Sequence, residues 1–174
     1  FYPDVLIRSM NDIDLLVRPL DVDRLCDFLE GRGFRFLMSE GTPRWGLTSS
    51  SSFHPLVSSD GGLIFDLHVA PDDYPVSRGL SVDDVFGRAR TIIVDGVAVS
   101  IPCDDDLVLL AITNAARDKF DPAALRSLVD LVTALVRGGI RPDWGAVTAR
   151  ASKGGFLRPL RVAARLLARL GVTP

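Results

Sequence analysis

Two aspartates separated by one residue, Asp12 and Asp14, stand at the start of an otherwise apolar run, NDIDLLVR. In an extended strand both side chains point to one face, while Ile13 and Leu15 point to the other face and into a core. Two close carboxylates raise one another's pKa unless a cation lies between them. A hard divalent cation, which prefers oxygen ligands, is the usual resolution. The spacing therefore indicates a candidate metal-binding pair.

A third acid lies in a second apolar run, LIFDLHV, where Asp66 and His68 share one face by the same alternation. If the two strands are neighbours, Asp12, Asp14 and Asp66 converge on a pair of Mg²⁺ or Mn²⁺ ions about 3.5–4 Å apart, an arrangement that serves phosphoryl and nucleotidyl transfer. The residues alone leave a second interpretation open. In that interpretation Asp12 lies in a turn, Asp14 is half-exposed at a strand edge, and an arginine neutralises Asp66.

The elements that must position these acids follow from hydrophobic periodicity. Residues 13–19 predict a buried strand that Pro19 ends. A helix should follow, capped by Asp21 or Asp23 and stopped by Gly31 and Gly33. Its apolar residues recur at helical spacing: Leu25, Cys26, Phe28 and Leu29.

Further strands are predicted at residues 34–38, at 53–59 and at 63–70, the last two joined as a hairpin through residues 60–62. A short helix is expected near residues 82–89. Residues 91–102 alternate apolar and polar side chains on both sides of Asp95-Gly96, which predicts a second hairpin.

The character changes after residue 103, where Asp104, Asp105 and Asp106 are expected to cap the first of four helices. The fold class is therefore predicted to be α+β, a mixed sheet with packed helices followed by a C-terminal helical half. We expect an α/β core over residues 1–102 and a helical subdomain over residues 103–174.

Composition restricts the cellular setting. The chain has 174 residues, 47% of them hydrophobic, and a formal net charge of -2, which gives no overall attraction to nucleic acid or an anionic membrane. Two cysteines and the lack of a long apolar segment favour a cytoplasmic protein. The last helix carries a basic stripe, which is either a solvated face or a contact for an RNA backbone: Arg158, Arg161, Arg165 and Arg169.

Several segments resemble one known family. The run RSMNDIDLLVRPLDVDRLCDFLEGRGF, the strand FDLHV and the stretch from LRSLVDLVTALVR through DWGAVTARASKGGF are similar to the uncharacterised nucleotidyltransferase family of the DNA polymerase beta-like superfamily. The similarity extends from about Arg8 to Leu170. It implies a nucleotidyltransferase-like sheet, with Asp12 and Asp14 as the metal-binding pair and Asp66 as the third catalytic carboxylate.

The resemblance also implies a reaction. An acceptor hydroxyl or amine would attack the α-phosphate of a nucleoside triphosphate (NTP) and release pyrophosphate, with positioning and charge neutralisation supplying most of the rate. Arg8 is expected to contact the nucleotide, and His68 is a candidate to orient the acceptor or relay a proton. The acceptor itself, the oligomeric state and the choice of NTP are not specified by the sequence.

One part of the family pattern is not found. The superfamily holds the triphosphate on a glycine-containing turn at a helix N-terminus upstream of the aspartate pair. Residues 1–7, FYPDVLI, contain no glycine, and the chain starts at Phe1, so we expect the helix and its turn to precede this sequence. The alternative is a catalytically degenerate module of this fold that senses a nucleotide or docks on a partner, as in toxin-antitoxin or biosynthetic pairs.

Overall fold

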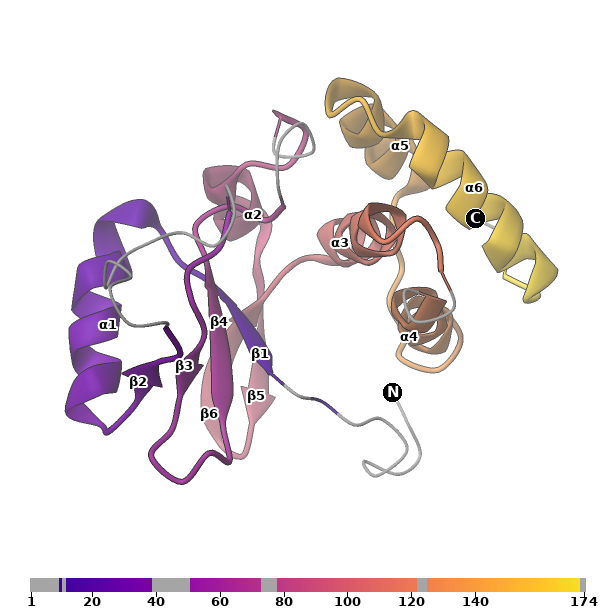
Figure 1. The fold of residues 1–174 in the computed structure, drawn as a ribbon. Coiled ribbons are helices and arrows are strands. Elements are labelled where there is room, and N and C mark those ends of the chain that lie inside the picture. The colour runs from indigo at the N-terminus through magenta and orange to yellow at the C-terminus, as the bar shows by residue number, and fades with distance from the viewer. Residues whose placement is uncertain (1–9, 11, 39–50, 73–77, 122–124, 173–174) are drawn as a thin grey trace.

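The computed structural model describes residues 10, 12–38, 51–72, 78–121 and 125–172. Its first part is a four-stranded mixed sheet with one packed helix (Figure 1). The elements of this part, in chain order, are β1 (Ile13–Leu16), the 3₁₀ helix η2 (Pro19–Asp21), α1 (Val22–Gly31), β2 (Arg35–Phe36), β3 (Leu56–Val57) and β4 (Ile64–His68).

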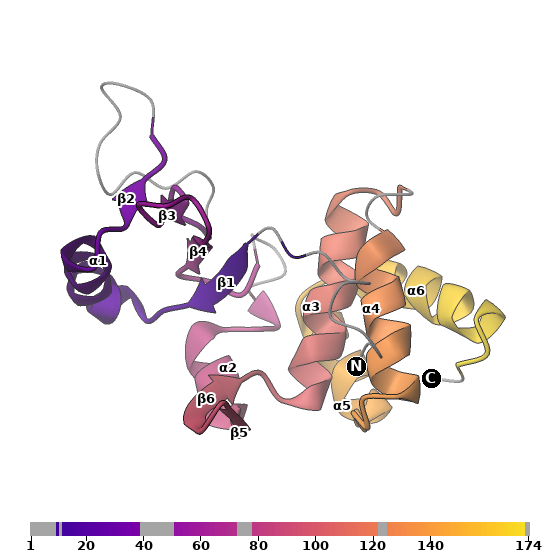
Figure 2. The ribbon, with the colours of Figure 1, turned by 90° about the horizontal axis from the view of Figure 1, so that it is seen from below.

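The second part begins with a short helix and a separate hairpin, which lead into four longer helices (Figures 1 and 2). These elements are α2 (Val82–Arg88), β5 (Arg90–Val94), β6 (Val97–Ile101), α3 (Asp104–Arg117), α4 (Leu125–Val136), α5 (Trp144–Lys153) and α6 (Leu157–Arg169). The predicted α+β class, with a mixed sheet followed by a helical half, is confirmed. Among the described residues, none of the helices is long and apolar enough to cross a bilayer.

Among the described residues the strand order in the sheet is β1-β4-β3-β2, so within this part of the chain β1 lies at the edge and pairs only with β4. β1 and β4 run parallel, whereas β3 is antiparallel to both β4 and β2. The predicted hairpin through residues 60–62 is therefore confirmed. The second predicted hairpin is also present, with Asp95 and Gly96 both at positive φ (49° and 79°), as a tight two-residue turn requires.

Alternation along β1 and β4 separates a core face from a polar face. On the core face Leu15 and Val17 pack with Leu67 and with Cys26 and Leu29 of α1. Phe28, another apolar residue of α1, does not join this cluster and is 55% exposed. Leu25 packs only at the edge of the cluster and is half-buried.

The helical half has its own hydrophobic core, formed mainly by α3, α4, α5 and α6. Leu80 and Val85 from the α2 region also lie in this core, and Leu16 of β1 packs against it. Leu16 thus links the sheet edge to the helices. The domain boundary at residues 102 and 103 stays a prediction.

The expected capping of α3 by its three leading aspartates is wrong. The N-cap residue is Cys103, which makes no side-chain capping bond. Asp104 accepts a hydrogen bond from the Arg141 backbone N–H (2.8 Å), and Asp105 accepts one from the Asp143 N–H (2.7 Å). Asp106 is fully buried and pairs with arginines from two other helices. Tertiary partners therefore take the place of local capping at this helix.

Candidate functional site

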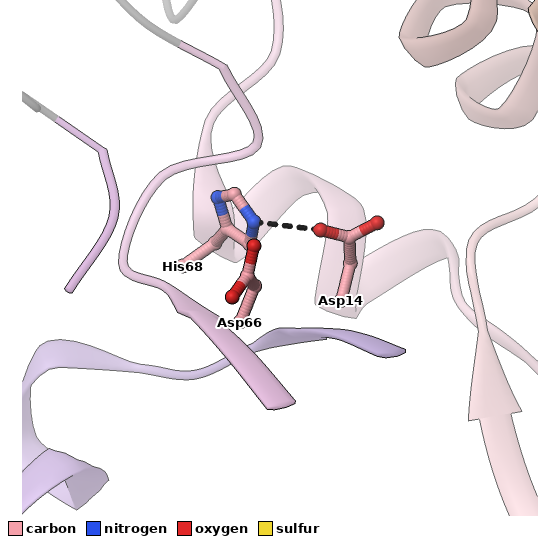
Figure 3. A group of neighbouring side chains, drawn as sticks. All are labelled: Asp14, Asp66 and His68. Carbon is pink, nitrogen blue, oxygen red and sulfur yellow. Dashed lines mark hydrogen bonds and ion pairs between the residues drawn. The ribbon is translucent and has the colours of Figure 1, made fainter. Parts of the chain in front are cut away.

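The site forms where β1 and β4 lie side by side. Their parallel register places Asp14 directly beside Asp66, which confirms that the two acidic strands are neighbours. Because side chains alternate along a strand, His68 lies on the same face as Asp66. Figure 3 shows all three side chains rising from the two strands on one side of the sheet.

The three side chains form a compact group. Because an ionised carboxylate only accepts hydrogen bonds, Nε2 of His68 donates to Oδ1 of Asp14, at 2.9 Å. One potential ligand atom from each of Asp14, Asp66 and His68 lies within 4.8 Å of the other two. The group lies on the face of the sheet opposite the hydrophobic cluster that contains residues of α1. Leu16 of β1 lies on this same face and packs against the core of the helical half.

The pKa values of the three side chains are shifted by different causes and not all in the same direction. The hydrogen bond from His68 lowers the pKa of Asp14, and the same bond raises the pKa of His68. Burial raises the pKa of Asp66, and the charges of Asp12 and Asp14 raise it further. The hydrogen bond from His68 therefore favours the ionised form of Asp14, whereas burial and the neighbouring carboxylates disfavour the ionised form of Asp66.

Asp66 also carries an unsatisfied atom. Its Oδ1 is buried and has no hydrogen-bond partner among the described residues. A buried acceptor without a partner is costly, and such atoms in folded proteins often mark an ion or a functional role. A cation placed between Asp14 and Asp66 would supply the missing partner and relieve their repulsion. Two carboxylates with an adjacent imidazole are a donor set that suits Mg²⁺, Mn²⁺ or a later divalent metal.

The other predicted site residues lie apart from this group or outside the described residues. Asp12 is exposed and immediately precedes β1; it is not one of the three grouped side chains, although its charge acts on Asp66. Arg8 lies outside the described residues. The arginines of the α6 stripe are exposed, while Leu160, Ala163 and Leu167 on the same helix are buried. This arrangement is that of a solvated face on an amphipathic helix.

One further residue near the site is not indicated by any sequence pattern. Arg117, the last residue of α3, is close enough for its charge to lower the pKa of both Asp14 and His68. It occurs in the ordinary helical run NAARD, and its position relative to β1 depends on how α3 packs. No spacing rule connects it with the acidic strands.

The Asp14–His68 pair predicts a pH dependence of stability in the metal-free protein. The raised pKa of His68 means that its contribution is complete below the ordinary value of 6.5 and is lost as the pH rises through the folded-state value. The lowered pKa of Asp14 means that its contribution is present above 3.8 and is lost as the pH falls. The pair should therefore stabilise most between these two values.

The measurement compares the wild type with His68→Gln by urea unfolding in EDTA. Because Asp14 is largely exposed, we expect the variant to lose less than about 1 kcal/mol near pH 5.5, and a smaller amount near pH 9. His54→Gln, which removes a histidine outside the group, is the matched control. A deficit for His68→Gln that is equal at both pH values would contradict the pairing.

Paired carboxylates and a histidine on one face of a mixed sheet define a protein with a site suited to metal or acid–base chemistry. The family described as "Uncharacterised nucleotidyltransferase" matches residues 1–171. The chain therefore belongs to this nucleotidyltransferase family, as its sequence motifs predicted. Neither the curated proteins nor the solved structures gave a match to the chain.

Proposed function

We propose that the protein is a divalent-metal-dependent nucleotidyltransferase that transfers a nucleoside monophosphate from an NTP to a hydroxyl or amine acceptor. The observation that carries the proposal is the register of β1 and β4, which sets Asp14 beside Asp66 in a chain of this family. In the reaction a bond forms between the acceptor oxygen or nitrogen and the α-phosphorus. The bond from that phosphorus to the bridging oxygen breaks, pyrophosphate leaves, and the acceptor loses a proton.

Asp14 and Asp66 would hold Mg²⁺ or Mn²⁺, with Asp12 as a third carboxylate at the open end of β1. When bound, such ions neutralise charge on the phosphates and stabilise the attacking and leaving oxygens. The unsatisfied Oδ1 of Asp66 supports this role, since that atom needs a cation or a donor. Asp66 is also the carboxylate proposed to help activate the acceptor.

His68 is proposed to orient the acceptor or take its proton. The hydrogen bond to Asp14 fixes the imidazole ring and raises its pKa, which makes it a better proton acceptor once it is neutral. Its place beside both carboxylates supports this role. The imidazole is also close enough to both carboxylates to be a metal ligand. Weaker metal binding by His68→Gln would indicate a ligand role, and unchanged metal binding would indicate a role toward the acceptor.

The test is the thermal unfolding of the full-length protein with Mn²⁺ or Mg²⁺, alone and with each NTP, together with an assay of pyrophosphate release. A ligand at ten times its dissociation constant stabilises by about 1.4 kcal/mol, which raises the unfolding temperature by about 3–6 °C at this size. We expect a metal-dependent shift that NTP enlarges, and release of pyrophosphate once an acceptor is supplied. EDTA should reverse both effects.

The outcomes separate the two candidate functions. Stabilisation by an NTP without pyrophosphate release, over a panel of protein, RNA and small-molecule acceptors, would favour the nucleotide-sensing module over the enzyme. A protein that responds to neither metal nor NTP would overturn the proposal.

A further inference from the structure

Arg117 ties the end of α3 to the segment that leaves the candidate site. Its Nη2 donates a hydrogen bond to Oδ1 of Asn114 at 3.1 Å, one turn earlier on α3. Its Nη1 lies 3.6 Å from Oδ1 of Asp72, a buried residue that follows β4. The guanidinium is thus held from two sides, by its own helix and by the chain that continues from His68.

The ion pair with Asp72, four residues after His68 in the chain, places the end of α3 beside the segment that leaves β4. Of the four long helices, α3 lies nearest to β1 in both views (Figures 1 and 2), and Leu16 packs against the helical core. The charge of Arg117 acts on Asp14 and His68. Its side chain is nevertheless 51% exposed, so part of its five-donor fork is available to a ligand.

The backbone after Arg117 fixes the end of the helix. Lys119 and Phe120 both adopt positive φ (57° and 54°), a conformation that is costly for residues other than glycine. Their N–H groups donate to Ala116 and Ala115 carbonyls, at 3.0 and 2.8 Å. These bonds stop α3 directly after Arg117, so the arginine stands at a defined point at the end of this helix.

We propose that Arg117 binds the phosphate chain of the NTP, with Asn114 and Asp72 as positioning residues. This inference rests on the proposed function. Asp14 and Asp66 bring negative charge to the place where a triphosphate must also lie, and a metal ion neutralises only part of the total. A guanidinium pairs with phosphate oxygens through two parallel hydrogen bonds, which a simple point charge does not offer. Arg117 supplies this group from the end of α3, where it pairs with Asp72 of the segment that follows β4.

A purely structural role makes a different prediction. If Arg117 only linked α3 to the segment after β4, its replacement would lower stability and leave nucleotide affinity unchanged. A phosphate contact, in contrast, changes the KM for NTP and the binding of a phosphate chain that carries no base or sugar. Inorganic triphosphate with Mg²⁺ is therefore the direct probe.

The experiment compares Arg117→Met and Arg117→Lys with the wild type, and uses Arg24→Met as the matched control. Arg24 is an exposed arginine of α1 that also pairs with an aspartate, Asp21, at 3.3 Å. We expect Arg117→Met to weaken Mg²⁺–triphosphate binding, and to raise the KM for NTP, by about 10- to 100-fold, the usual loss for a hydrogen-bonded charge. Arg117→Lys should recover part of the loss, and Arg24→Met should behave as the wild type. Mn²⁺ binding without nucleotide should persist in Arg117→Met.

Two results overturn the inference in distinguishable ways. Wild-type KM and triphosphate affinity in folded Arg117→Met would exclude the phosphate contact and leave the proposed function standing. A wild-type protein that binds neither Mn²⁺ nor Mg²⁺–triphosphate and releases no pyrophosphate would overturn both.

Discussion

Asp66→Asn is expected to reduce NTP-dependent pyrophosphate release by about 10³-fold or more, because a metal-held charge contributes several kcal/mol to the transition state of phosphoryl transfer. The substitution keeps the size of the side chain and removes the negative charge. Asp14→Asn should cause a loss of the same order, since the register sets the two carboxylates side by side. The measurement is the steady-state rate of pyrophosphate release at saturating NTP and metal.

Stability distinguishes this loss from a folding defect. Burial and the charges of Asp12 and Asp14 raise the pKa of Asp66, so its ionised form is disfavoured in the metal-free fold. Asp66→Asn should therefore unfold in EDTA at a temperature no lower than the wild type, while the shift that Mn²⁺ produces disappears. Asp23→Asn, at an exposed position of α1, is the matched control and should keep both activity and the Mn²⁺ shift. An active Asp66→Asn would refute the proposed role of this carboxylate.

Asp12 is tested separately because it lies outside the grouped side chains. If Asp12 binds metal, Asp12→Asn should lose activity and the Mn²⁺ shift as Asp14→Asn does. If its charge only acts at a distance on Asp66, the loss should be small. The double variant Asp12→Asn/Asp14→Asn should be inactive and folded in either case.

Most of the fold could be predicted from local patterns. The Asp95-Gly96 turn predicted its hairpin because this dipeptide adopts the positive φ angles that a tight turn needs. Periodicity located the helices and strands, although β1 ends at Leu16, before the predicted limit at Pro19. Errors arise where tertiary contacts override local preference, as at the start of α3. The carboxylates of Asp104 and Asp105 accept hydrogen bonds from distant backbone N–H groups, and the carboxylate of Asp106 pairs with two distant arginines.

The core of the site could also be predicted, because strand alternation alone places Asp66 and His68 on one face and Asp14 on the polar face of β1. That the strands are neighbours was a condition of the prediction, and the parallel register of β1 with β4 fulfils it. The hydrogen bond between His68 and Asp14 and the approach of Arg117 were not predictable. Both depend on the relative placement of elements far apart in the chain, which no local pattern specifies.

Asp106, whose carboxylate is buried, is the second residue whose substitution we expect to have a large effect. Oδ1 of Asp106 accepts hydrogen bonds from Nη2 of Arg88 and Nη1 of Arg150, both at 3.1 Å, and Oδ2 accepts from Nε of Arg88 at 3.2 Å. Arg88 ends α2 and Arg150 lies on α5, so one acid at the start of α3 joins three helices. Arg150 also pairs with Asp105 at 3.2 Å. The network anchors the opposite end of the helix that carries Arg117.

Asp106→Asn should destabilise the protein by about 2–4 kcal/mol, because removing one partner from a buried ion pair leaves the other charges uncompensated. The estimate lies toward the lower end for such losses, since Arg88 keeps Asp84 at 3.6 Å and Arg150 keeps Asp105. Chemical unfolding in urea measures the loss as a shift of the midpoint at constant slope.

The matched control is Asp83→Asn, since Asp83 is 93% exposed and pairs with Arg18 at 4.0 Å. A surface pair of this kind contributes at most about 1 kcal/mol, so the control should unfold close to the wild type. A loss for Asp106→Asn no larger than that of Asp83→Asn would show that the network does not hold α3. The position of Arg117 would then depend on its own contacts with Asn114 and Asp72 and on the bonds that end α3.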